Sequence, residues 1–240
     1  MAGHSKWANI QHRKSRVDAK RGKIFTRLAK EITVAARLGG GDPTGNPRLR
    51  QAVQEARANN MPNDNIERAV LKGTGELEGV SYEECLYEGY GPGGTALMVE
   101  AVTDNRNRTV AEIRHLFSRH GGNMGENGCV SWMFERRGFL AVDPETIEEE
   151  DFINLALELG ADDLETEGGS FILFTAPENY HGIVEGLSER NLEISSKSLA
   201  MIPSNTVELD DDTKAKLQRL IEALEDHDDV QDVWANLAES

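Results

Sequence analysis

Cysteine, aromatic residues and long apolar runs are all scarce in this sequence of 240 residues. Only two cysteines occur, Cys85 and Cys129, and their spacing matches neither a disulfide framework nor a zinc motif. No apolar run approaches the roughly eighteen residues that cross a membrane. The first residues lack the apolar stretch of a secretory signal. The sequence therefore predicts a reduced, cytoplasmic protein with no membrane partner.

Motifs of hydrolases and metalloenzymes are also missing from the sequence. It contains no His-Glu-x-x-His, no Gly-x-Ser-x-Gly and no Cys/His cluster with zinc spacing. Acidic runs at residues 162–163, 210–212 and 228–229 fall at predicted element boundaries, where carboxylates cap helices or keep the surface hydrated. The sequence therefore favours a protein that is not an enzyme and needs no metal, cofactor or small-molecule substrate. An undetected hydrolase is the minor alternative.

Positive charge is scarce in the last two thirds of the chain and concentrated in the first. Residues 1–72 carry fifteen Lys and Arg against six Asp and Glu, a net charge of +9, whereas the other 168 residues have a net charge of −25. An acidic body repels nucleic acid, so a basic segment on it can be the patch that binds. A solvated Lys/Arg-rich helical face is the alternative, and the ordered spacing of the cations favours binding.

Several of these cations share one face of a predicted helix. From residue 18 to residue 38, apolar residues recur at steps of three and four, which is typical of an amphipathic helix. Five cations lie within about a third of a turn on the opposite side, so we predict a phosphate-binding stripe there. The stripe consists of Lys20, Lys23, Arg27, Lys30 and Arg37.

A short basic arm precedes this helix and extends the predicted contact surface. Such an arm can fold onto phosphates and follow a groove or channel. Its arginines can bind a phosphate through two N–H donors, whereas lysine acts as a point charge. Trp7 either stacks on an exposed base or packs against the helices. The predicted nucleic-acid-binding residues are Lys6, Trp7, Arg13, Lys14, Arg16, Lys20, Arg21, Lys23, Arg27, Lys30 and Arg37.

Helix and strand signals predict a multidomain chain, α in its first part and α+β in the rest. Two more helices, one started by Asn46 and Pro47, complete a three-helix bundle in residues 1–75. Residues 136–203 follow the β-α-β-β-α-β order of a ferredoxin-like unit. The last helix and strand lack a sheet of their own. We therefore predict that residues 80–135 and 204–240 form one acidic α+β domain, interrupted by the ferredoxin-like domain.

Local predictions concern the middle of the chain. Thr109 is expected to cap a helix that ends near His120, and residues 129–134 are expected to form a strand. Arg106 and Arg108 precede that helix and form a possible secondary anion site beside its free N–H groups. We favour the alternative in which Asp104 pairs with one of them. The glycines of residues 121–128 suit a tight connection with positive φ angles rather than a phosphate-cradling loop.

Several short motifs resemble those of the YebC/PmpR family. Residues 2–7 (AGHSKW), 9–10 (NI), 12–14 (HRK) and 20–23 (KRGK) resemble its opening, and residues 60–62 (NMP) with 65–69 (NIERA) resemble its third-helix signature. Residues 103–109 (TDNRNRT), residues 121–125 (GGNMG) and Trp132 resemble its second-domain signatures. The resemblance spans essentially the whole chain. Gln11 and Leu71 stand where many members have basic residues, and each departure removes about one phosphate contact.

The resemblance implies three domains and a role in gene expression. Bacterial members are generally described as DNA-binding transcriptional regulators, a mitochondrial member is a translational activator, and bacterial relatives have been linked to relief of ribosome stalling. Three classes therefore stay open: a regulator of double-stranded DNA, a ribosome-associated factor contacting rRNA or tRNA, and a protein-interaction module. No clear helix-turn-helix is predicted, which weakens direct base readout, and a flexible basic arm suits structured RNA equally well. We predict a non-enzymatic, nucleic-acid-binding regulator.

Overall fold

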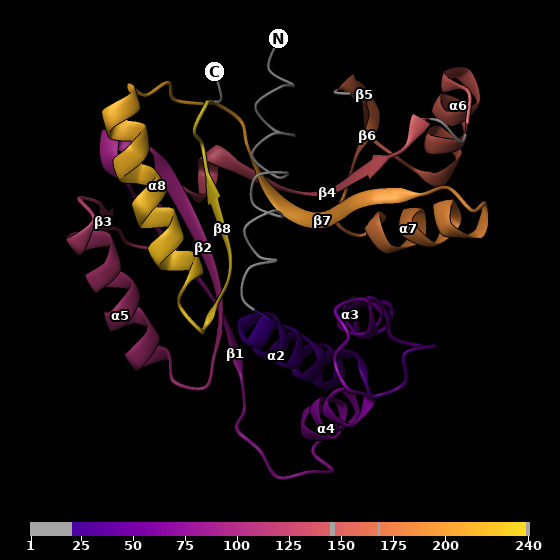
Figure 1. Cartoon of the computed structure of the whole chain (residues 1–240), viewed down its shortest axis with the longest axis horizontal. Helices are drawn as coiled ribbons and strands as arrows, with labels where there is room; N and C mark the ends of the chain where they lie inside the picture. The colour runs from indigo at the N-terminus through magenta and orange to yellow at the C-terminus, as the bar shows by residue number, and fades with distance from the viewer. Residues whose placement is uncertain (1–20, 145–146, 168, 239–240) are drawn as a thin grey trace. The chain divides into compact units, whose positions relative to one another are not determined.

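A computed structural model describes residues 21–144, 147–167 and 169–238 of the chain. These residues form two compact units, one comprising residues 21–131 and 209–235 and the other residues 132–208 and 236–238. Each unit has its own four-stranded antiparallel sheet (Figure 1). None of the helices in the described ranges is both long enough and apolar enough to cross a membrane.

Three helices at the start of the first unit pack around a small apolar core. They are α2 (Arg21–Gly39), α3 (Pro47–Ala58) and α4 (Asn63–Thr74). The Asn46 side chain caps α3 by accepting the Leu49 N–H at 3.1 Å, as the sequence predicts. Gly73 lets α4 approach α2 closely, since a Cβ there would lie 2.4 Å from the backbone oxygen of Thr33. Ile32, Leu49 and Ala56 on the inward faces are fully buried.

The first sheet has the strand order β3-β1-β2-β8 and is antiparallel throughout. Its strands are β1 (Glu83–Tyr90), β2 (Ala96–Thr103), β3 (Asn123–Met124) and β8 (Val230–Ala235). Helices α5 (Arg106–Arg119) and α8 (Asp211–Glu225) cover one face of it (Figure 1). A short 3-10 helix, η1 (Pro92–Gly94), connects β1 and β2. Strand β8 follows the second unit in sequence, so the end of the chain completes a sheet begun near its middle.

The second sheet has the strand order β5-β6-β4-β7, with α6 and α7 packed on it. Its elements are β4 (Phe134–Val142), α6 (Glu149–Leu159), β5 (Asp163–Glu167), β6 (Ser170–Thr175), α7 (Tyr180–Glu189) and β7 (Ile194–Pro203). Strands β4 and β6 are central, as the ferredoxin-like arrangement requires. Leu140, Phe152, Leu173 and Tyr180 lie in its core. The predicted α plus α+β fold class is confirmed.

The strand predicted at residues 129–134 is wrong for all but its last residue. A turn and a short 3-10 helix, η2 (Ser131–Met133), occupy this segment, and β4 begins only at Phe134. The buried Glu88 carboxylate accepts backbone N–H groups from Gly128 at 2.7 Å, Val130 at 2.9 Å and Ser131 at 2.7 Å. These amides converge on one side chain, so they are not available to a strand ladder.

The predicted start of helix α5 is also wrong. The helix begins at Arg106, and the Asn105 side chain caps it by accepting the Arg108 N–H at 3.1 Å. Thr109, the predicted cap, lies inside the helix and is fully buried. Its hydroxyl lies 2.7 Å from the carboxylate of Asp229, on the loop before β8. Near the end of the chain, Val207 forms a single parallel bridge with Leu237.

Candidate nucleic-acid interface

The structure describes only part of the predicted contact surface. Six of the predicted residues lie outside the described ranges, namely Lys6, Trp7, Arg13, Lys14, Arg16 and Lys20. Arg21 is described by its backbone alone, as the first residue of α2. The other four predicted cations lie on α2, and the protein itself engages all of them: Lys23, Arg27, Lys30 and Arg37.

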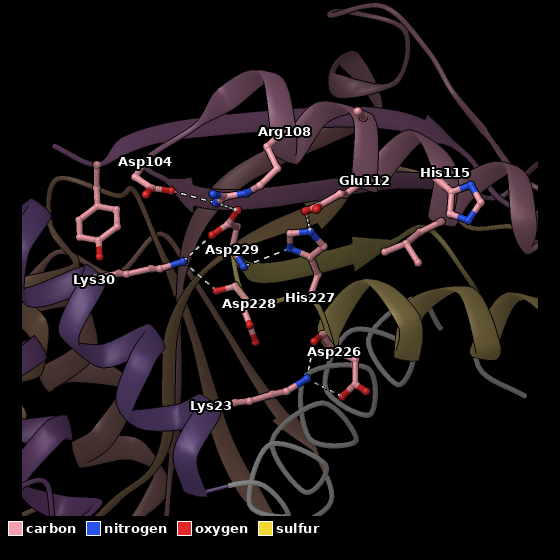
Figure 2. A pocket seen from close by; sticks show the side chains of 13 residues that line it. Lys23, Lys30, Asp104, Arg108, Glu112, His115, Asp226, His227, Asp228 and Asp229 are labelled. Atoms are coloured by element: carbon pink, nitrogen blue, oxygen red, sulfur yellow. Dashed lines mark hydrogen bonds and ion pairs between the residues drawn. The ribbon is translucent and has the colours of Figure 1, made fainter. Parts of the chain in front are cut away.

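Lys30 is a buried residue that contacts the sheet domain of its own unit (Figure 2). Its ammonium group donates to the backbone oxygens of Val102 at 3.1 Å and Asp228 at 2.8 Å, and to Asp229 Oδ1 at 2.6 Å. A lysine ammonium has three N–H donors. All three have acceptors here, so Lys30 cannot reach a phosphate in this arrangement.

Lys23 and Arg27 contact the C-terminal end of α8. The Lys23 ammonium donates to the backbone oxygen of Asp226 and pairs with the Asp226 carboxylate at 3.3 Å, and the Arg27 guanidinium donates to the backbone oxygen of Glu225. Burial lowers the pKa of Arg27, and the nearby charge of Glu225 and Asp226 opposes that shift. Carbonyls in the last turn of a helix lack helical partners and carry partial negative charge. They therefore attract cations much as an anion would.

Arg37, in the last turn of α2, contacts the segment that leads into β1. Its guanidinium donates to the backbone oxygen of Tyr82 and to Ser81 Oγ at 3.2 Å. The predicted helix is thus present as α2, and it carries these four cations. Their partners in the structure, however, are backbone oxygens and carboxylates of the protein itself.

Asp229 is the centre of the network that holds Lys30. While Oδ1 accepts Lys30, Oδ2 accepts Arg108 at 2.9 Å, Thr109 at 2.7 Å and Thr103 at 3.2 Å. Burial alone would raise the pKa of Asp229, but the hydrogen bonds from Lys30, Thr109 and Arg108 outweigh it and hold the pKa well below its usual range. Sequence reasoning placed this residue on the surface, because no local motif connects it to residues more than 100 positions away.

Arg108 follows the structural alternative favoured from the sequence. Its guanidinium pairs with Asp104 at 2.8 Å and with Asp229 at 2.9 Å. Arg106 is exposed in the first turn of α5. The pairing of Asp104 with an arginine is therefore confirmed, and an anion site at Arg106 stays a prediction.

A groove of about 1060 Å³ lies beside this network, between α2, α5 and residues 226–229 (Figure 2). Its lining contains three Lys or Arg side chains and five carboxylates, so it does not favour a polyanion. The charged residues are Lys23, Lys30, Asp104, Arg108, Glu112, Asp226, Asp228 and Asp229.

Glu112, His227 and Asp229 bring their potential ligand atoms within 4.8 Å of one another. His227 Nε2 lies 2.8 Å from Glu112 Oε2, and His227 Nδ1 accepts the backbone N–H of Asp229 at 3.1 Å. Both ring nitrogens are thus used, and the Asp229 oxygens already bind Lys30 and Arg108. A metal ligand needs a free lone pair, so this geometry favours a hydrogen-bonded network over a metal site.

Exposed cations elsewhere on the three helices were not among the predicted contacts. Arg57 near the end of α3 and both Arg68 and Lys72 on α4 have exposed side chains. By contrast, Arg48 binds Glu31 at 2.6 Å and Glu84 at 2.7 Å. The number of basic residues in the helices therefore overstates how many are available to a phosphate. Only a structure separates the exposed cations from those already paired within the protein.

Two family models match the chain. A model described as "TACO1/YebC protein N-terminal domain" matches residues 5–76, and one described as "TACO1/YebC second and third domain" matches residues 82–237. Together they account for nearly the whole sequence, as the resemblance of the short motifs led us to expect.

Curated relatives match over almost their full length. Proteins from Halothermothrix orenii and Natranaerobius thermophilus, each named a probable transcriptional regulatory protein, are 57% and 55% identical over 98% of this chain and 94% and 96% of theirs. The crystal structure of a conserved hypothetical protein from Aquifex aeolicus is 49% identical, with a TM-score of 0.81 over 92% of this chain and 91% of that one. The chain therefore belongs to the TACO1/YebC family.

Proposed function

We propose that the chain is a non-enzymatic regulator of gene expression that binds nucleic acid, with double-stranded DNA as the first candidate. The observation that carries the proposal is the separation of charge, +9 in residues 1–72 against −25 in the remainder. Relatives that match over almost their whole length are named probable transcriptional regulatory proteins, which supports the same role.

The contacts within the structure narrow the set of residues proposed to bind phosphates. Because Lys23, Arg27, Lys30 and Arg37 already have partners in the protein, the first contacts fall to the cations that precede them. These are Lys6, Arg13, Lys14, Arg16, Lys20 and Arg21, with Trp7 available for stacking. The exposed Arg57, Arg68 and Lys72 extend this set.

The acidic remainder of the chain restricts how a polyanion can approach. Surfaces of like charge repel, so a nucleic acid that binds residues 1–72 avoids the regions that carry the net charge of −25. The proposed contact with a polyanion is therefore confined to the basic segment.

Structured RNA on the ribosome is the second candidate, because α4 lacks the features of a DNA-reading helix. A DNA-reading helix presents side chains that donate to base edges and phosphates. The exposed face of α4 instead includes Asp64 and Glu67 near its start, and the link from α3 is only residues 59–62. No recognition helix is therefore evident among residues 21–75, and contact with the phosphates of rRNA or tRNA needs none.

Crosslinking and sedimentation test the proposal and separate its two forms. Recovery of defined DNA fragments after crosslinking supports the transcriptional role. Co-migration with ribosomes in a sucrose gradient, lost after nuclease treatment, supports the translational role. A protein that recovers no nucleic acid and sediments alone under both conditions contradicts the proposal.

A further inference from the structure

The C-terminal end of α8 and the loop after it hold three cations that the sequence assigned to phosphate binding. We infer that residues 225–229, here called the α8 terminus, compete with nucleic acid for Lys23, Arg27 and Lys30. Docking of these side chains restrains binding, and release of the helical region from the α8 terminus strengthens it. This inference rests on the proposed nucleic-acid-binding function.

In this contact, one face of α2 lies against the C-terminal end of α8 and the loop after it. Lys23, Arg27 and Lys30 are spaced four and three residues apart, so they project from the same face of α2. Their backbone acceptors are the oxygens of Asp226, Glu225 and Asp228, respectively, which follow one another closely in the chain. Carbonyls at the C-terminal end of a helix carry partial negative charge, so they attract these cations as the phosphates of a nucleic acid would.

The contact becomes more buried along α2 from Lys23 to Lys30. The Lys23 side chain is 33% exposed and its partner Asp226 is 56% exposed, whereas Lys30 and Asp229 are 8% and 6% exposed. The outer end of the contact is therefore within reach of an approaching phosphate while the inner end is not. Lys23 is the first cation for which a phosphate can compete, and Lys30 becomes accessible only after the helical region moves.

Release of Lys30 does not leave its partner without donors. Asp229 Oδ2 still accepts Arg108 and Thr109, which both belong to α5 in the sheet domain. Losing a lysine partner costs less free energy for a carboxylate that keeps an arginine partner than for one left without any cation. The α8 terminus can therefore lose and regain the helical region without rebuilding its own network.

Docking also places acidic groups beside the cations. Asp226 and Asp228 are exposed next to Lys23 and Lys30 and line the same groove (Figure 2). Their charge repels a phosphate backbone at short range. The docked arrangement therefore weakens binding in two ways, by occupying cations and by adding like charge.

Duplex binding by a full-length variant with Asp226→Asn and Asp228→Asn tests the inference. The matched control carries Asp211→Asn and Asp212→Asn, the same change of charge in the first turn of the same helix. We expect the first variant to bind a labelled 24-base-pair duplex about fivefold or more tightly than the control, a typical size for coupled sites. Affinity equal to that of the control contradicts the inference.

Hydrogen exchange of the unmodified protein supplies an independent readout. Addition of the duplex should speed amide exchange in residues 225–230, because the side chains that cover the α8 terminus leave it. If the protein binds the duplex while exchange there stays unchanged or slows, the competition is refuted and the proposed function stands. If neither duplex DNA nor structured RNA binds at any salt concentration, the proposed function fails and the inference fails with it.

Discussion

Replacing Lys30 with Met removes one charge from a buried ion pair and keeps an unbranched side chain of similar length. The Lys30 ammonium makes three hydrogen bonds, and the shortest, 2.6 Å, joins it to Asp229. Removing one partner of a buried pair leaves the other charge uncompensated, at a cost of about 3–5 kcal/mol. Because Arg108 and Thr109 still donate to Asp229, we expect a loss of about 3 kcal/mol in the free energy of unfolding, the lower end of that range.

Thermal unfolding followed by calorimetry measures this loss. For a unit of this size, each kcal/mol lowers the Tm by about 2–4 °C, so the Lys30→Met variant should unfold about 6–12 °C lower. Lys23→Met is the matched control, since it removes the same charge from a pair that is largely exposed and worth about 0–1 kcal/mol. Its Tm should fall by no more than about 4 °C.

A double-mutant cycle identifies the partner of Lys30. In Lys30→Met with Asp229→Asn, the buried carboxylate that lost its lysine partner is also gone, so the double variant should lose less stability than the sum of the two single variants. A Lys30→Met variant no less stable than Lys23→Met refutes the argument that this pair ties α2 to the sheet domain. Strict additivity of the two changes refutes the pairing itself.

Three further outcomes follow from individual contacts. Folding depresses the pKa of Asp229, so its contribution to stability is complete above about pH 4 and is lost as the pH falls through the folded pKa. In acid titrations, the difference in free energy of unfolding between wild type and Asp229→Asn should therefore shrink below about pH 4. Glu88→Gln weakens the hydrogen bonds that the carboxylate accepts from three backbone N–H groups. It should lower the free energy of unfolding in urea by about 1.5–3 kcal/mol and speed amide exchange at residues 128–131. Gly73→Ala places a methyl 2.4 Å from Thr33 O and should cost about 1–3 kcal/mol by calorimetry.

Elements defined by local signals could be predicted from the sequence. The periodicity of apolar residues located α2, and Asn46 with Pro47 marked the start of α3. Helix caps and amphipathic faces depend on residues that are close together in the sequence. The order of helices and strands in the second unit was likewise enough to predict its ferredoxin-like sheet.

Features set by distant contacts could not be predicted in this way. Residues 129–133 have apolar residues suited to a strand, yet Glu88, some forty positions earlier, binds their amides. The spacing of Lys23, Arg27 and Lys30 showed that they share a face but not what that face meets. Their acceptors are mostly backbone oxygens near residues 225–228, and a backbone carbonyl has no sequence signature.

The salt dependence of duplex binding tests the central claim, that residues before α2 supply the phosphate contacts. A full-length variant with Arg13, Lys14 and Arg16 changed to Gln is compared with one in which Lys214, Lys216 and Arg219 of α8 are changed to Gln, so that both lose three positive charges. We expect the slope of log K against log salt to flatten by about 2.7 in the first variant and to stay unchanged in the second. Equal slopes in the two variants contradict the account.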